Sequence, residues 1–483
     1  MIVEYHSYPV LSRYFLEYIV KKAIKVTIAL SADSDYKGLL MDNKHILLKG
    51  TLILTLAGFL TKILGFLYRI FLSQTIGAQG MGIYQLIFPI HTLCFALTVG
   101  GIQTAISRFV AARVALKDEQ GARDIFLIAT SLSMAISFAV TFLLYRHASW
   151  FAVHILLEEQ CTDLLRVSSL SIPMGTFHSC AYGYYLARKK TGIPAWSQLV
   201  EQTARMSATY LLYLVWTGEG HPLTPMLAVV GLFAGELVSM LFSLLFILWD
   251  YRKYHYQISN IHAPGKDLKD IVSLSLPLTG NRLFINILHS MESVLIPGHL
   301  RLFGMDSASA LSIYGVLNGM ALPLILFPSA ITNAVSAMLL PSVAQDQAVG
   351  NYKNIRRSIF TTTRYCLLLG FLSTAFFYFS GDFLGLFLFK NEFAGTFIKT
   401  LSFICPCLYL SSTLSGILNG LGETGKYFAQ NLLGLSIRLL FVFFVIPRFG
   451  ILGYLWGLLI SELAITLLTL FFLKDYMKTA PGE

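Results

Sequence analysis

The sequence predicts an all-α polytopic membrane protein with about 12 transmembrane helices, arranged as two parallel six-helix repeats. Of its 483 residues, 55% are hydrophobic and 13% are charged, whereas soluble domains carry about 25% charged residues. Apolar runs long enough to cross a bilayer, which takes roughly 20 helical residues, recur along the chain after residue 45. A set of residues from the first half returns in the second half at constant spacing, which indicates an internal duplication.

Residues 1–45 differ from the rest of the chain and are not expected to join the membrane domain. They contain Lys21, Lys22 and Asp33 and no apolar run of span length, so an interfacial amphipathic helix is the most they can form. Met41 stands just before the membrane domain. We therefore expect translation to begin at Met41, in preference to a functional N-terminal arm.

The first expected span, 46–73, carries two positive charges within an apolar run. Lys62 and Arg69 lie about two helical turns apart and therefore share a face. Because a charge at mid-bilayer costs on the order of 3 kcal/mol on insertion scales, Lys62 is expected to have a function. A Gly-rich turn at Ile76–Gly82 ends this span. The later spans are expected at 82–112, 124–145, 163–187, 193–216, 226–249, 270–300, 310–343, 357–380, 396–419, 427–447 and 451–473.

Lysines and arginines gather in alternate loops, after the even-numbered spans, and are scarce after the odd-numbered ones. By the positive-inside rule both termini are cytoplasmic. The loop with Arg146 and Cys161 is then extracytoplasmic, and an impermeant thiol reagent should label Cys161 if that loop is exposed. The net charge of +10 fits this topology; nucleic-acid binding is the weaker interpretation, because no basic patch with aromatics stands apart from the helix ends. The expected units are a leader (1–45), a first bundle (46–255), a cytoplasmic linker (256–269), a second bundle (270–474) and a cytoplasmic tail (475–483).

The internal repeat pairs intramembrane charges as well as apolar residues. Gly183 and Arg205 recur at one spacing as Gly416 and Arg438, and GLFAGEL at 231–237 recurs as GLLISEL at 457–463. Six helices separate each pair, so matched residues lie on the same side of the membrane, as in a parallel repeat about an axis along the membrane normal. The pattern predicts two similar bundles that face each other across a cleft.

Two matched Arg–Glu pairs are interpreted as structural. Arg205 with Glu236, and Arg438 with Glu462, come from neighbouring helices of the same bundle, and charges inside a membrane usually pair with one another. Glu201 also reaches Arg205 at one-turn spacing. The second copy has glycine in place of Glu201, so that contact is not part of the repeat.

Lys62 and Arg282 lie on the first and seventh helices, with no acid at comparable depth on either helix. Unpaired cations are tolerated there if they face a water-filled cavity or an anionic ligand. The alternative is that they snorkel to the interface or have a backbone partner. His289 and Glu292, one turn apart, are candidates for ion coupling or for pairing with a cation. The chain shows no nucleophile–base set, phosphate loop or metal-ligand spacing, so no enzyme activity and no cofactor is predicted.

Several motifs carry a family resemblance. Thr61–Phe66, Tyr68–Leu72 and Ile76–Ala78 resemble the first helix of the stage V sporulation protein B group, within the multidrug/oligosaccharidyl-lipid/polysaccharide (MOP) exporter superfamily. Gly319–Leu324 and Phe327-Pro328 resemble its eighth helix. This family usually has Arg where Lys62 stands, and many members have fourteen spans where this chain has about twelve.

The resemblance implies a flippase of the bacterial cytoplasmic membrane that moves an undecaprenyl-diphosphate-linked glycan, a peptidoglycan or polysaccharide precursor, by alternating access. The same resemblance implies a role in spore cortex or cell-wall synthesis and a monomeric state. It also implies contact with membrane lipids and cell-wall synthesis proteins as partners. Lys62, Arg69 and Arg282 would bind the diphosphate, since Arg holds phosphate oxygens bidentately. The alternative is a cation-coupled multidrug antiporter of the same superfamily. Acids would line the cavity of such an antiporter, so the sign of the cavity distinguishes the two.

Overall fold

The computed structural model describes residues 43–253 and 264–479, and these residues form helices joined by short connections. The first half of the described chain comprises α2 (Asn43–Val99), α3 (Ile102–Ala115), α4 (Glu119–Arg146), α5 (Ala148–Trp150), η1 (Phe151–Ile155), α6 (Cys161–Ala187), α7 (Gly192–Glu219) and α8 (Met226–Lys253). The second half comprises α9 (Pro264–Leu302), α10 (Ser307–Gly315), η3 (Val316–Ala321), α11 (Leu322–Leu326), α12 (Ser329–Ala348), α13 (Tyr352–Phe389), α14 (Glu392–Ser402), α15 (Cys405–Gly420), α16 (Thr424–Phe444), α17 (Ile446–Phe449) and α18 (Ile451–Thr479).

The all-α polytopic fold class is confirmed. Within the described residues, eight helical segments are long and apolar enough to cross a membrane, and nine if the bent pair α14 and α15 counts as one. One of the eight, Leu52–Ala115, has 64 residues, which exceeds the roughly 20 that one span needs. Each of the twelve predicted ranges falls on a helix or on a run of consecutive helices. Helices α6 and α7 are long enough, but their composition is more polar. Ser168, Ser169 and Ser171 of α6 are buried within the protein.

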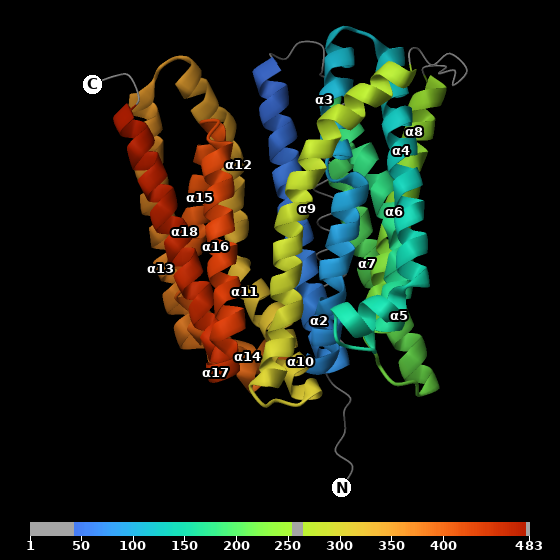
Figure 1. The fold of residues 1–483 in the computed structure, drawn as a ribbon. Helices are drawn as coiled ribbons and strands as arrows, with labels where there is room; N and C mark the ends of the chain where they lie inside the picture. Colours follow the sequence, from blue (N-terminus) through green and yellow to red (C-terminus); the bar gives the residue numbers. More distant parts are fainter. Residues whose placement is uncertain (1–42, 254–263, 480–483) are drawn as a thin grey trace.

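The predicted Gly-rich turn at Ile76–Gly82 is wrong in extent. Helical dihedrals continue on both sides of a single residue, Gly77, whose φ of 71° and ψ of −177° break α2 into two arms. A positive φ is open to glycine without a Cβ clash. Figure 1 shows the first arm running from the end of the molecule near α3 toward α10, and the second arm returning beside it.

Two predicted spans are broken helices. The range 310–343 contains α10, the π-helix η3, α11 and α12, with the last break at Phe327 and Pro328. Pro328 has no N–H to continue the ladder of hydrogen bonds. The range 396–419 contains α14 and α15, which meet at an angle of 60°.

Several predicted boundaries differ from the structure. The linker 256–269 lies partly outside the described residues, and from Pro264 onward it is already helix α9. The tail 475–483 is helical as far as Thr479. Cys161 is not in an exposed loop: it begins α6, it is 0% exposed, and its thiol lies against Ile83. The leader and Met41 lie outside the described residues, and the division into bundles stays a prediction.

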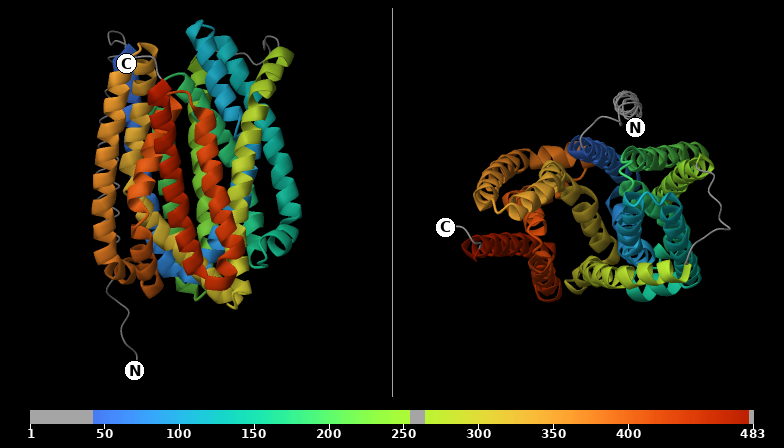
Figure 2. Two further views of the ribbon diagram at one scale, coloured as in Figure 1. Left: turned by 60° about the vertical axis from the view of Figure 1, so that its left-hand side comes forward. Right: turned by 90° about the horizontal axis from the view of Figure 1, so that it is seen from above.

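Two groups of helices stand side by side, with α9 between them. Figure 2, in the view from above, shows α2–α8 (blue to green) on one side and α12–α18 (orange to red) on the other. Helix α9 crosses obliquely in Figure 1 and packs on α2, α3 and α4 as well as on α16 and α17. The crossing is close because Gly101 lacks a side chain: a Cβ there would lie 2.1 Å from the carbonyl oxygen of Ser275. One long helix therefore contacts both groups.

Candidate functional site

A cavity of about 690 Å³ lies between the two halves of the chain. Its walls come from both arms of α2, from the middle of α9, and from η3, α11 and α12 with their neighbours. The polar and charged side chains among its lining residues are Lys62, Arg69, Gln85, Thr92, His289, Ser290, Ser293, Tyr314, Asn318, Ser329 and Asn333. The cavity thus has the position expected of a substrate site in a two-bundle transporter.

The charge of this cavity is positive. Lys62 and Arg69 line it from the first arm of α2, and His289 lines it from α9. No acidic side chain is among the described residues that line it. Lys62 is exposed and forms no ion pair within the described part of the chain. A cavity with this set of charges suits an anion.

Arg69 reaches across the cavity to the second half of the chain. Its Nη1 donates a hydrogen bond of 3.2 Å to the backbone carbonyl of Asn318, which belongs to the π-helix η3. A carbonyl carries no counter-charge, so the guanidinium stays cationic while it joins the two halves. Its free N–H groups remain available to an anion in the cavity.

Arg282 is not among the residues that line the cavity. It is exposed on α9, and its Nη2 donates to Thr104 Oγ1 of α3 at 3.3 Å. Of the three cations expected to bind the diphosphate, Lys62 and Arg69 therefore line the cavity in this conformation and Arg282 does not. Arg282 lies two turns before His289 and on the same face of α9. Lys62 and Arg69 have the same spacing on α2.

The first half contains a partly buried charge cluster around Arg205. Its Nη2 contacts Glu201, and Glu236 lies 3.8 Å away. His178 Nδ1 lies 3.7 Å from Glu201 and 4.0 Å from Glu236. The predicted pair of Arg205 with Glu236 is present, but Glu201 is the closer partner. Two carboxylates thus surround one guanidinium.

The second half contains a matching cluster around Arg438. Its Nε lies 2.9 Å from Glu292 of α9, and its Nη1 lies 3.7 Å from Glu462. Tyr454 donates a hydrogen bond of 2.8 Å to Glu292, and His289 Nδ1 lies 3.6 Å from the same carboxylate. The closer partner of Arg438 is therefore Glu292, so this ion pair links α9 to α16. His289 connects the cluster to the cavity.

Sequence reasoning missed His178 and the role of Glu292 as the closest partner of Arg438. His178 is buried and hydrogen-bonds Ser239 through Nδ1 at 2.8 Å and Ser197 through Nε2 at 3.1 Å. A histidine among the serines of an otherwise apolar span was the available signal. Its partners lie on α7 and α8, and their identity depends on helix packing.

One group of side chains in the described residues has the geometry to hold a metal ion: His178, Glu201 and Glu236, whose ligand atoms lie within 4.8 Å of one another. Arg205 already contacts both carboxylates. A fixed guanidinium at that place repels a divalent cation, so the cluster fits an internal ion pair better than a metal centre.

The two halves are joined firmly at the end of the molecule where α10 lies. A Cβ on Gly82 would lie 2.0 Å from the carbonyl oxygen of Leu311, and one on Gly315 would lie 2.1 Å from that of Ala78. Small residues of this kind let two helix backbones approach closely. Arg301 of α9 forms an ion pair of 3.1 Å with Glu158 of the first half. At this end of the molecule α2 packs directly on α10.

These features define a multi-pass membrane transporter of the MOP superfamily, in which two helical halves enclose a central cavity. The chain belongs to the family described as Polysaccharide biosynthesis protein, which matches residues 47–347. Residues 282–444 also match the MatE family.

Relatives and solved structures agree with this assignment. The chain is 28% identical to stage V sporulation protein B of Bacillus subtilis (strain 168) over 88% of this chain and 83% of the relative. It is 25% identical to the lipid II flippase MurJ of the same organism, over 67% of this chain and 62% of MurJ. An inward-facing MATE family multidrug resistance transporter aligns with a TM-score of 0.66 at 14% identity, over 87% of this chain and 95% of that one. At this identity the structural likeness shows the fold alone. Those relatives whose names state an activity are a flippase and a transporter, not enzymes.

Proposed function

We propose that this protein is a flippase of the bacterial cytoplasmic membrane that moves an undecaprenyl-diphosphate-linked glycan by alternating access. The observation that carries the proposal is the cavity between the two halves, which is lined by Lys62, Arg69 and His289 and by no described acid. A diphosphate supplies the negative charge that such a cavity lacks. The relatives include a flippase of lipid II, which supports a precursor of peptidoglycan or polysaccharide as the class of cargo.

Lys62 and Arg69 are proposed to hold the diphosphate. They lie roughly 10 Å apart along the helix axis, since seven residues rise 1.5 Å each, so neighbouring phosphates can contact both cations. Arg69 offers a planar fork of N–H groups to phosphate oxygens, and Lys62 offers a point charge. Arg282 is proposed to meet the anion at another stage of the cycle, since it continues the cavity face of α9.

The coupling of transport to an ion is proposed to run through His289 and Glu292. His289 lines the cavity, Glu292 is 6% exposed behind it, and Arg438 lies beyond at 2.9 Å. A proton taken up from the cavity by His289 or Glu292 would weaken the ion pair between Glu292 and Arg438, which attaches α9 to α16. A change at the cavity would in this way alter how the crossing helix is held.

A cation-coupled drug antiporter is the alternative. Its cavity would need carboxylates to hold organic cations, and the lining residues favour an anion instead. A binding measurement on the purified protein distinguishes the two functions. An antiporter should bind a lipophilic cation, and a flippase should bind undecaprenyl diphosphate.

The test is binding of undecaprenyl diphosphate to the purified protein in nanodiscs, with complementation of a strain depleted of its own flippase. Lys62→Ala should weaken binding roughly tenfold or more, because a charge-assisted contact is worth about 1.5–3 kcal/mol. Lys62→Arg should retain activity, and Lys62→Glu should abolish export at normal protein level. Lys474→Ala, which removes an exposed cation at the end of α18, is the control. Unchanged binding and export in well-expressed Lys62→Ala and Arg69→Ala would reject the proposal.

A further inference from the structure

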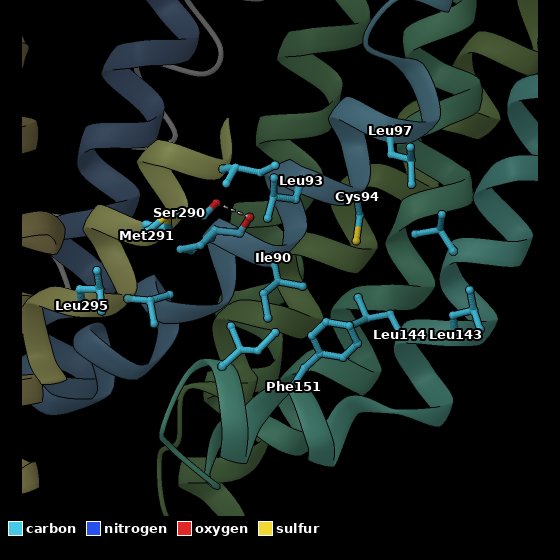
Figure 3. A pocket seen from close by; sticks show the side chains of 15 residues that line it. Ile90, Leu93, Cys94, Leu97, Leu143, Leu144, Phe151, Ser290, Met291 and Leu295 are labelled. Atoms are coloured by element: carbon cyan, nitrogen blue, oxygen red, sulfur yellow. Dashed lines mark hydrogen bonds between the residues drawn. The ribbon is translucent and has the colours of Figure 1, made fainter. Parts of the chain in front are cut away.

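A second cavity, of about 460 Å³, lies on the opposite side of α2 and α9 from the charged one. Figure 3 shows its walls: Ile90 and Leu93 from α2, Leu143 from α4, Phe151 from η1, and Met291 from α9. Ser290 is the one residue with a polar side chain, apart from the Cys94 thiol, among the described residues that line it. We call this second cavity the apolar groove.

The apolar groove opens on the flank of the protein. Leu97, Leu143 and Met291 line it and are 44%, 56% and 41% exposed. They belong to helices that span the membrane, so the side chains at the mouth of the groove face the hydrocarbon of the bilayer. An apolar cavity open to the bilayer is filled by a hydrocarbon chain and not by water.

The apolar groove and the charged cavity share a wall. Pro89 of α2 and Ser290 of α9 line both of them. Ser290 Oγ donates a hydrogen bond of 3.1 Å to the carbonyl of Pro89, drawn as the dashed line in Figure 3. The contact between Pro89 and Ser290, part of the packing of α2 on α9, therefore lies between a cationic site and an apolar one.

We propose that the apolar groove binds the hydrocarbon tail of the lipid-linked substrate while its diphosphate lies in the charged cavity. The proposal rests on the function proposed above, because it takes the two cavities to hold the two ends of one molecule. The junction between head and tail would then pass between α2 and α9 at the Pro89–Ser290 contact. The polar head can enter the protein without drawing the tail out of a hydrocarbon environment.

The groove would select this tail because the tail is covalently attached to a bound head group, and not because the groove is more hydrophobic than the bilayer. Lipid chains are as apolar as leucine, so leaving the bilayer for the groove gains a tail little free energy. A tail attached to a head group already bound next door has a high effective concentration at the groove. An unattached acyl chain has no such advantage. The groove should therefore raise the affinity for a long-chain diphosphate and leave that for a short-chain diphosphate unchanged.

Substitutions that fill the groove test this inference. Leu143→Trp and Met291→Trp place a large side chain in it from α4 and from α9, and Leu245→Trp places one at a lipid-facing site of α8 that is 66% exposed. Affinities of the purified protein in nanodiscs are compared for undecaprenyl diphosphate and for geranyl diphosphate, a short-chain probe. Each groove variant should lose at least about tenfold in affinity for the long chain, a part of the roughly 10²–10⁴-fold gain that linking two binding groups can give. Geranyl diphosphate should bind all variants as it binds the unchanged protein.

A photoreactive undecaprenyl diphosphate, with the reactive group near the first isoprene units, gives a second measurement. Its crosslinks should map to α2, α4 and α9 around Leu93, Leu143 and Met291. Equal long-chain affinity in the Leu143→Trp, Met291→Trp and Leu245→Trp proteins would overturn the inference. Crosslinks spread evenly over lipid-facing positions such as Leu372 of α13 would do the same. If neither diphosphate binds the unchanged protein, the proposed function itself fails and the inference fails with it.

Discussion

Replacing Arg438 by Met removes a guanidinium that lies between two buried carboxylates, Glu292 and Glu462. Glu292 and Glu462 are 6% and 9% exposed, at 2.9 Å and 3.7 Å from Arg438. Breaking a buried pair by removing one partner costs about 3–5 kcal/mol, because the charge that remains is uncompensated. In Arg438→Met two carboxylates are left in that state. Membrane abundance of the variant should therefore fall strongly.

The matching acid variant should behave differently. Glu462→Gln leaves Arg438 with Glu292, its closer partner, so the cluster becomes a neutral pair and the variant should keep near-normal abundance. A pair made of Arg438 and Glu462 alone would instead make both single changes equally damaging. Arg438→Met combined with Glu292→Gln and Glu462→Gln should recover abundance, since no buried charge remains.

The assay is quantitative immunoblotting of membranes together with the thermal unfolding midpoint of the protein in detergent. Arg205→Met and Glu236→Gln repeat the comparison in the first half, where Glu201 is the remaining partner of Arg205. Normal abundance of Arg438→Met, or equal loss in Glu462→Gln and Arg438→Met, would refute the reasoning from the clusters.

Three further predictions concern helix packing, topology and the chain start. Gly82→Ala should separate α2 from α10 and lower the unfolding midpoint, since its Cβ would lie 2.0 Å from the carbonyl oxygen of Leu311. Gly218→Ala is the control, because a Cβ there has nothing within 4 Å. Equal midpoints of the two variants would contradict the close packing. A cysteine introduced at Lys189 should escape an impermeant thiol reagent on intact cells, and buried Cys161 should also stay unlabelled; labelling at Lys189 would reverse the topology. Mass spectrometry of the native N-terminus should find Met41 first, and peptides from residues 1–40 would reject that start.

Much of the architecture follows from the sequence alone. Span length and apolar composition are local properties that the bilayer thickness imposes, so all twelve predicted ranges fall on helices. The common face of Lys62 and Arg69 follows from helical periodicity, and both residues line one cavity. The matched Arg–Glu pairs were visible because the repeat places them at corresponding positions.

The partners of these charges were decided by the tertiary structure. Glu292 is the closer partner of Arg438 because α9 crosses between the two groups of helices, and no periodicity in the sequence encodes that crossing. Arg282 contacts Thr104 and not the cavity for the same reason. His178 joins the first cluster through the packing of α6 on α7 and α8. The tilt and rotation of a membrane helix are set by packing against its neighbours, whereas its length and apolar composition are set by the lipid.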